Sequence, residues 1–265
     1  MHPEFIRIVE EAVARKFHVH LFSNCIMSSE KADFLGALPP GQLSVLANVS
    51  PQANDTERQI TMRSYALEKL GRCAALGITV TSPEFAFDFL IDYIEQFGLA
   101  PTVRVGIAQP IVGTDNDYLD PEDYPKVGAG IVKMAETCVE KDILIGFDCG
   151  LTLCMFTEEQ LGRLATCTEG FKMLCDPIID IGPDLDVWSC FPLSEVLNTR
   201  LDDFECRNDI VAFYKRELAP YRSLGCMPRC LKCDYKRRGQ CKGGCLAHAL
   251  KSLNRTPPRY ASRSR

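Results

Sequence analysis

The first 160 residues alternate between segments with a helical spacing of apolar residues and short apolar runs rich in β-branched residues. The helical segments are residues 2–17, 56–77, 85–98 and 123–142. The short runs are residues 18–22, 43–47, 78–81, 102–106 and 143–147. Helices that alternate with short strands are typical of a parallel sheet with helical crossovers. The pattern therefore predicts an α/β fold, with helices over one face of a parallel sheet and the other face partly open.

Glycines and capping residues indicate where some of these helices end or begin. Gly77 and Gly98 suit the C-terminal caps of the second and third helical segments. Thr157, followed three residues later by Gln160, predicts a capping box at the start of another helix. That helix leads from the α/β array into a segment of different composition.

Cysteines dominate this second segment. Eleven of the 14 cysteines lie in residues 149–245. We therefore expect two domains, an α/β domain over residues 1–160 and a small cysteine-rich domain with a basic tail over residues 161–265.

The N-terminal residues contain no targeting pattern. They are charged and amphipathic, and no apolar run in the chain reaches the roughly 18 residues of a membrane span. We expect a cytoplasmic chain that does not contact the membrane. Because thiols stay reduced in the cytoplasm, clustered cysteines favour metal binding over disulfides.

The strongest chemical pattern is the segment GCMPRCLKCDYKRRGQCKGGCLAH, residues 225–248. Its cysteines are spaced as CxxxCxxC and then CxxxC: Cys226, Cys230, Cys233, Cys241 and Cys245. So polar a segment offers no hydrophobic core that could bury five thiols. Thiolates this close together select zinc or an iron–sulfur cluster. Upstream, Cys175 and Cys190 flank a predicted β-hairpin and are further candidate ligands.

Charge is also distributed unevenly. The sequence has 30 Lys and Arg and 35 Asp and Glu, a net charge of −5, yet from Arg229 onward eleven basic residues accompany a single acidic one, Asp234. One interpretation is a basic zinc-binding module that contacts nucleic acid or an acidic protein. Only Tyr235 and Tyr260 lie among the basic residues, which disfavours nucleic acid because single strands are bound by stacking on aromatic side chains.

The cysteine spacing is similar to that of a known family. Cys175-x14-Cys190, a long gap, CxxC, another Cys and a Gly-Cys ending resemble the SPASM domain, or its shorter Twitch form, of radical SAM proteins. The resemblance includes the N-terminal segment HPEFIRIVEEAVARKFHVHLFSNC, which is similar to the sequence that follows the second barrel strand in this family. It therefore covers nearly all of the chain. It implies a partial (β/α) barrel of parallel strands, a C-terminal domain with one or two auxiliary [4Fe–4S] clusters, and an enzyme that modifies peptides or matures other enzymes.

The resemblance also apportions the ligands between two clusters. One cluster would take Cys175, Cys190 and Cys245. The other would take Cys230, Cys233 and Cys241, with Cys226 in place of a ligand that the family has farther downstream. Leu185 stands where the family usually has Gly, and a version with a single cluster stays open.

The part of the family pattern that initiates the radical reaction is absent. Neither a CxxxCxxC after a first barrel strand nor a GGEP-like turn is present, so the chain resembles the family with two βα units removed from the front. We expect it to be inactive alone and to use S-adenosylmethionine only when that part is supplied. By resemblance, Asn48 and Ser50 would contact S-adenosylmethionine. The sheet exposed by the missing units would favour self-association, and a peptide or protein is the expected substrate.

Three further residues stay open. Cys149 and Cys154 follow the last predicted strand, where barrel-type folds place functional groups, and they are either redox or ligand residues or packed thiols. His248 is another candidate ligand because it follows the cysteine-rich block directly. No GxSxG, P-loop, HExxH or GxGxxG segment is present, which argues against a serine hydrolase, P-loop enzyme, zincin or Rossmann oxidoreductase.

Overall fold

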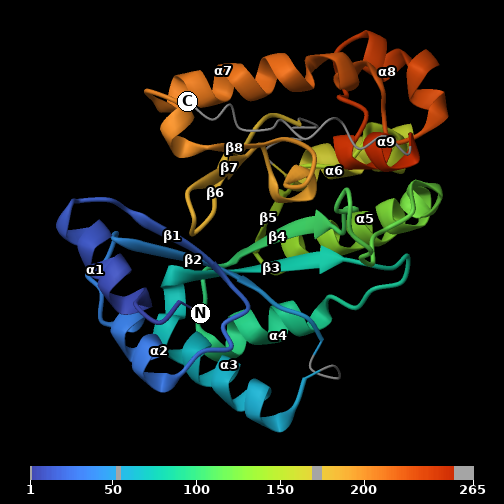
Figure 1. Cartoon of the computed structure of the whole chain (residues 1–265). Helices are drawn as coiled ribbons and strands as arrows, with labels where there is room; N and C mark the ends of the chain where they lie inside the picture. The colour runs from blue at the N-terminus through green and yellow to red at the C-terminus, as the bar shows by residue number, and fades with distance from the viewer. Residues whose placement is uncertain (1, 52–54, 169–174, 254–265) are drawn as a thin grey trace.

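The computed structural model of the protein describes residues 2–51, 55–168 and 175–253. Within these ranges five parallel strands form the central sheet, in the same order as along the chain (Figure 1). The strands are β1 (Val19–Ser23), β2 (Leu43–Asn48), β3 (Ala74–Val80), β4 (Thr102–Ile107) and β5 (Leu144–Phe147). Each pairs in parallel with its neighbour; for example, Asn48 lies opposite Gly77. The predicted α/β fold with a parallel sheet is confirmed.

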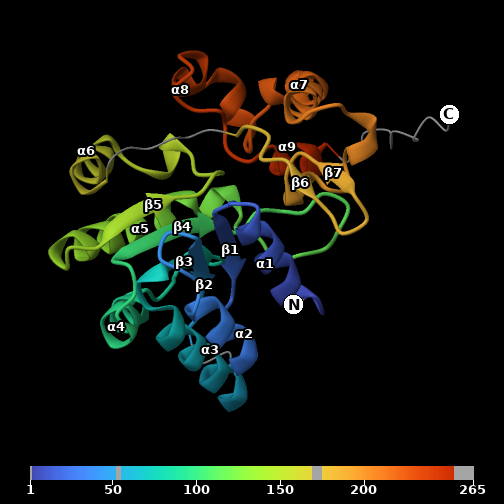
Figure 2. The same cartoon turned by 90° about the vertical axis from the view of Figure 1, so that its left-hand side faces the viewer.

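Helices connect the strands. They are α1 (Phe5–Ala14), α2 (Ser29–Gly36), α3 (Glu57–Leu70), α4 (Asp88–Phe97), α5 (Tyr124–Glu140) and α6 (Glu158–Cys167). Figures 1 and 2 show α2, α3 and α4 on one side of the sheet and the C-terminal elements on the other. On β2, Leu43, Val45 and Ala47 are buried while the residues between them are half-buried, so the two faces of the sheet are covered unequally.

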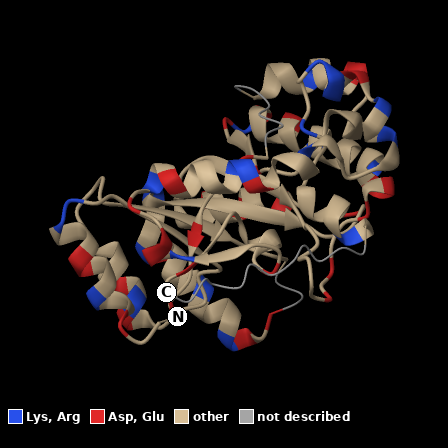
Figure 3. Cartoon of the chain, turned by 45° about the horizontal axis from the view of Figure 1, so that its top comes forward, with Lys and Arg blue, Asp and Glu red and all other residues tan. Residues whose placement is uncertain are grey.

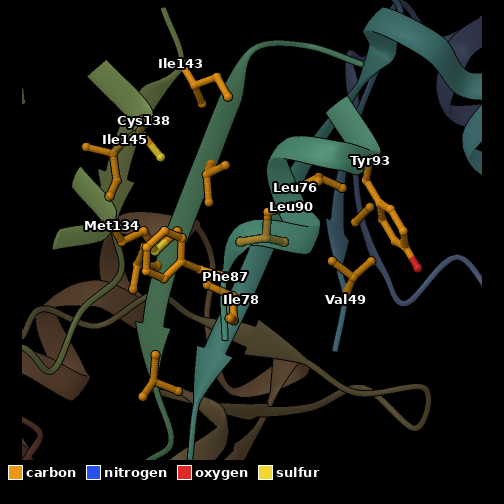
Figure 4. Close-up of a cluster of buried hydrophobic side chains, with 14 of the residues drawn as sticks. Val49, Leu76, Ile78, Phe87, Leu90, Tyr93, Met134, Cys138, Ile143 and Ile145 are labelled. Atoms are coloured by element: carbon orange, nitrogen blue, oxygen red, sulfur yellow. The ribbon is translucent and has the colours of Figure 1, made fainter. Parts of the chain in front are cut away.

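The main hydrophobic core lies between the sheet and these helices (Figure 4). Leu76 and Ile78 of β3, Leu90 of α4 and Met134 of α5 all contribute buried side chains to it. Cys138 of α5 is 1% exposed, and burial raises its pKa to about 11. Cys138 is therefore a core residue on the buried face of α5.

Two of the predicted helix ends are confirmed and one is wrong. Gly98 caps α4 in the left-handed conformation, and Thr157 and Gln160 form the capping box of α6. The helix expected to continue to Gly77 ends instead at Leu70, where Gly71 has a φ of 46°. Gly77 therefore lies inside β3 and not at a helix cap. An Ala- and Leu-containing segment is a good helix former, but here pairing with β2 and β4 places it in the sheet.

The C-terminal part, residues 175–253, contains a small antiparallel sheet and three helices. Its strands are β6 (Asp180–Ile181), β7 (Asp186–Trp188) and β8 (Asn198–Arg200), and its helices are α7 (Arg207–Leu218), α8 (Asp234–Arg237) and α9 (Leu246–Ser252). β6 and β7 form the hairpin predicted between Cys175 and Cys190. A second hydrophobic core joins this sheet to α7 and α9 through Val187, Tyr214 and Leu250.

Charged residues lie mainly on the helices (Figure 3). Arg104 on β4 is the only Lys, Arg, Asp or Glu in the five parallel strands. The edge strands expose Phe22 on β1 and Leu144 on β5, which are 66% and 62% exposed. In the part of the chain that the structure covers, no helix is both long enough and apolar enough to span a bilayer. Of the eleven basic residues from Arg229 onward, seven lie in the described residues and four lie in residues 254–265, outside them.

Candidate functional site

Three of the predicted cysteine ligands gather beside the small sheet. Cys175 precedes the hairpin, Cys190 follows β7, and Cys245 directly precedes α9. The Cys245 side chain is buried in the second core, and Cys175 and Cys190 pack against that core. Burial and, to a lesser extent, negative charge on Cys175 together raise the pKa of Cys190 to about 12. We call Cys175, Cys190 and Cys245 the hairpin group.

Three other predicted ligands gather on the side of the C-terminal part that faces the main core. Cys226 lies in a loop, Cys230 lies in the short 3₁₀ helix η8 (Pro228–Lys232), and Cys241 follows α8. Cys230 and Cys241 are buried in the main core, and Cys226 packs against it. These three residues are called the loop group below.

The loop group contains a thiol that is readily ionised. The Cys226 side chain donates a hydrogen bond to the Cys230 sulfur, which lowers the pKa of Cys230, and positive charge on Lys236 and Arg229 lowers it further. The same hydrogen bond, together with burial, raises the pKa of Cys226. Thiolates are the form that binds metal, so the hydrogen bond and the two cations favour the metal-binding form of Cys230, whereas burial opposes it.

Glycines allow the backbone to approach these sulfurs closely. A Cβ on Gly225 would lie 2.7 Å from the Cys230 Sγ, and a Cβ on Gly244 would lie 2.9 Å from the Cys226 Sγ. Gly243 and Gly244 have φ values of 86° and 79°, a left-handed conformation that glycine adopts without strain. The N–H of Gly243 donates a 3.3 Å hydrogen bond to the Cys241 Sγ. A cradle of glycines with an N–H donor to a sulfur suits an iron–sulfur cluster, whose sulfurs accept such bonds.

Cys149 and Cys154, whose roles the sequence leaves open, lie beside these two groups. Cys149 lies two residues after the end of β5, and Cys154 lies in the 3₁₀ helix η4 (Leu153–Met155) a few residues later. The pKa of Cys149 is raised by burial and then by the Cys175 thiol, whereas Cys154 packs against the same core as the loop group. The loop after the last parallel strand therefore meets the cysteine-rich C-terminal part.

Cys233 is less buried than Cys230 and Cys241 of the same motif. It is half-buried and does not pack against the core that holds Cys230 and Cys241. All 14 cysteines are free thiols. Across residues 2–51, 55–168 and 175–253, no three Cys, His, Asp or Glu side chains are placed to share one metal ion. Each group is thus a set of neighbouring thiols and not a preformed tetrahedral site.

A cavity of about 400 Å³ lies on the face of the sheet opposite the helices, near the carboxyl ends of the strands. Asn48 lines it and donates a 3.2 Å hydrogen bond to the Thr79 hydroxyl. Ser50, the other residue expected to contact S-adenosylmethionine, is exposed and does not line this cavity. An ion pair between Arg104 and Asp148 forms part of the wall. Burial raises the pKa of Asp148, and the guanidinium of Arg104 opposes that rise.

His248 has protein partners of its own. Its ring is buried on α9, with Nε2 within 3.3 Å of the Tyr124 hydroxyl and the Tyr118 ring 5.5 Å away, edge-on. Burial lowers the pKa of His248 to about 4, so the imidazole is neutral near neutral pH. These contacts account for a histidine at this position without a bound metal.

The chain was compared with protein-family models, with curated proteins and with solved structures. None of them matches it. What this site binds is therefore inferred from the geometry of its own residues alone.

Some of these site residues carry no signal in the sequence. The Arg104–Asp148 pair joins residues that are separated by one βα unit, and nothing in either segment marks them as neighbours. Two of the glycines that lie close to cysteine sulfurs, Gly243 and Gly244, stand out in the sequence as part of KGGC. The third, Gly225, is identified only by its distance to Cys230. The close approach of the 149–154 loop to the C-terminal cysteines also follows only from the fold.

Proposed function

We propose that this chain is an iron–sulfur protein of the radical SAM type, in which a SPASM- or Twitch-like C-terminal domain holds auxiliary [4Fe–4S] clusters against a partial (β/α) barrel. The observation that carries the proposal is the gathering of thiols from distant segments into two groups. In the hairpin group, Cys175 and Cys190 are 15 positions apart in the sequence and Cys190 and Cys245 are 55 apart, yet all three pack around one small core. A chain with ordinary structural cysteines has no reason to collect thiols in this way.

The cofactor in this proposal is the [4Fe–4S] cluster, and it would supply one-electron transfer. The protein's own contribution is to hold the thiolates, to donate hydrogen bonds to sulfur and to balance charge. A cluster with four thiolates is anionic, and Lys236 and Arg229 are placed to offset that charge and raise the reduction potential. The Gly243 N–H acts in the same direction.

The turn between β6 and β7 supports the family resemblance. Radical SAM proteins with a SPASM domain usually have Gly at the position of Leu185. Leu185 has a φ of 64°, in the left-handed region that favours glycine. The backbone conformation expected for the family is thus present although the residue has changed.

The cavity beside the sheet supports a place for a small molecule. Asn48 and Asp148 line it at the strand ends, where parallel α/β folds bind ligands. We assign contact with S-adenosylmethionine to Asn48, and we propose a peptide or protein as the substrate and the cytoplasm as the location. The auxiliary sites alone are electron-transfer sites, and radical initiation needs a further cluster with an open iron position.

The test is the metal content of the chain purified and reconstituted without oxygen. We expect about four irons and four acid-labile sulfides for each cluster, hence about eight of each if both groups are loaded. Replacing Cys226 and Cys230 together by Ala should remove about four of each, because these two thiols belong to the loop group. Cys206→Ala is the matched control, since Cys206 is exposed and belongs to neither group. One zinc per group and no iron would reject the proposal and favour a zinc-binding interaction module.

A further inference from the structure

A second cavity, of about 390 Å³, lies between the β6–β7 hairpin and the start of α7. Its volume falls within the range of roughly 300–1,000 Å³ that is usual for binding pockets. None of its lining residues belongs to the hairpin group or the loop group. We call this cavity the apolar groove, because most of its lining consists of Ile178, Ile179, Ile181, Leu201, Phe204 and Ile210.

Hydrogen bonds and ring contacts hold the walls of the apolar groove in place. In the 3₁₀ helix η6 (Leu201–Asp203), the Leu201 N–H donates a 2.9 Å hydrogen bond to the Leu185 carbonyl in the hairpin turn. The Phe204 ring meets the Phe213 ring edge-on, with 5.5 Å between the ring centres. Ile210 is 4% exposed and closes the groove on its inner side. Because the walls are already fixed, a partner that enters the groove loses little affinity to ordering them.

The outer rim of the groove is uncovered. Ile178 and Ile181 are 59% and 50% exposed. Within the described residues, β6 has a strand neighbour on one side only, because the small sheet runs in the order β6-β7-β8. Exposed apolar side chains beside an unpaired strand edge are typical of surfaces that bind another polypeptide in an extended conformation.

The groove lies in an acidic part of the chain. Residues 175–210 contain nine acidic and two basic residues. One of these basic residues, Arg200, is paired with Asp186 at 3.4 Å, which leaves one basic residue against eight acidic ones. Glu205 lines the groove, and Asp202 is exposed on η6 next to it. This excess of negative charge repels nucleic acid and anionic membranes and attracts a basic partner.

We propose that the apolar groove binds a basic polypeptide segment in which apolar residues are flanked by Arg or Lys. The apolar side chains enter the groove, and the flanking cations lie beside Glu205 and Asp202. The inference adds a partner surface to the proposed function, and it holds whether the thiols bind iron or zinc. A second copy of this chain and the chain's own residues 254–265 are the competing occupants.

Isothermal titration calorimetry of the full chain tests the proposal. The probe is the hexapeptide Arg-Arg-Leu-Phe-Arg-Arg, acetylated and amidated at its ends. One control peptide, Glu-Glu-Leu-Phe-Glu-Glu, reverses the charge, and another, Arg-Arg-Ser-Ser-Arg-Arg, removes the apolar side chains. We expect the probe to bind at least about tenfold more tightly than either control, and its affinity to fall as added salt screens the charges.

Variants of the full chain locate this binding. Ile181→Ser removes an apolar side chain of the groove and should weaken binding of the probe about tenfold. Its matched control is Ile8→Ser on α1, where the isoleucine is 52% exposed. Glu205→Gln should weaken the probe about threefold, since an exposed charge contributes modestly. Its control is Glu10→Gln, also exposed and on α1. Both controls should bind the probe like the unmodified chain, and circular dichroism checks that each variant is folded.

The outcomes separate the three occupants. No binding of the probe, or equal binding by Ile181→Ser and the unmodified chain, overturns the proposal. A dimer in light scattering that Ile181→Ser dissociates would make the groove an interface between copies. A full-length variant with the four arginines of residues 254–265 changed to serine tests the last occupant. If only that variant binds the probe, the groove belongs to the chain's own C-terminal residues and the proposal is wrong. Metal loading enters none of these measurements, so their outcome is independent of the test of the proposed function.

Discussion

Gly128 on α5 shows how a single residue determines where the 149–154 loop lies. A Cβ at this position would be 2.1 Å from the carbonyl oxygen of Met155 and 2.9 Å from its carbonyl carbon. Both are backbone atoms, so a change of side-chain rotamer cannot relieve the clash. The absence of a side chain lets η4, and Cys154 within it, pack directly on the helix.

Gly128→Ala should therefore destabilise the protein by about 1–3 kcal/mol, the usual cost of overpacking a close contact. The control is Gly162→Ala on α6, where a new Cβ meets nothing within 4 Å. Since Ala is the better helix former, that variant should gain up to about 1 kcal/mol. Urea unfolding midpoints measure both. Equal midpoints for Gly128→Ala and the unmodified chain would show that α5 and η4 do not pack as described.

For single residues, the sequence shows which side chains could bind metal better than it shows which side chains contact one another. The spacing of Cys226, Cys230 and Cys241 already indicates a metal site. The expectation that so polar a segment offers its thiols no core is wrong, because Cys230 and Cys241 are buried in the main core. Their proximity to Cys154 depends on the path of the chain around Gly128. A contact of that kind depends on backbone geometry that no local pattern encodes.

At the scale of elements, helix–strand alternation predicts the sheet but not each boundary. The five strands are parallel as expected because helices separate them along the chain. The predicted end of α3 is wrong by seven residues and the predicted start of β3 by four, because Ala74 and Leu76 suit a helix as well as a buried strand. Strand pairing with both neighbours decides such a case, and pairing is a tertiary property.

Helix α9 joins the C-terminal part to α5 through a buried histidine. His248 lies against Tyr124, and burial lowers its pKa to about 4 from an ordinary value of 6.5. Asp120 acts in the opposite direction, and Lys251 adds to the lowering. Above pH 6.5 the histidine is neutral in both the folded and the unfolded chain. As the pH falls from 6.5 to 4, only the unfolded chain takes up the proton, so the folded state loses stability.

We therefore expect the metal-free protein to lose at most about 3 kcal/mol between pH 7 and pH 4 because of this one group. His248→Gln keeps a polar side chain near Tyr124 and removes the titration. The measurement is the free energy of unfolding at several pH values, in metal-free protein so that acid release of metal does not contribute. The variant should lose less stability in acid than the unmodified chain. Identical pH profiles would mean that His248 is not buried in its neutral form.

At the scale of the whole molecule, the thiol groups lie where the two parts of the chain meet. The loop group packs against the core of the parallel sheet, and the hairpin group packs against the core of the small sheet. Metal bound at both places would stabilise the contact between the parts as well as each part alone, because small metal modules gain folding energy from their metal. The sequence predicts a cysteine-rich C-terminal segment, but its docking on the sheet is evident only in three dimensions (Figure 2).

In the proposed function, each of the two thiol groups holds an iron–sulfur cluster of four irons. Mössbauer spectroscopy of the chain reconstituted with ⁵⁷Fe tests it most directly, because the spectrum identifies both the type of iron site and the number of irons in it. We predict that nearly all of the iron, about eight atoms per chain, gives the signal of [4Fe–4S] clusters with thiolate ligands. A spectrum of single iron ions bound by thiolates, or a chain that takes up no iron, would contradict the account.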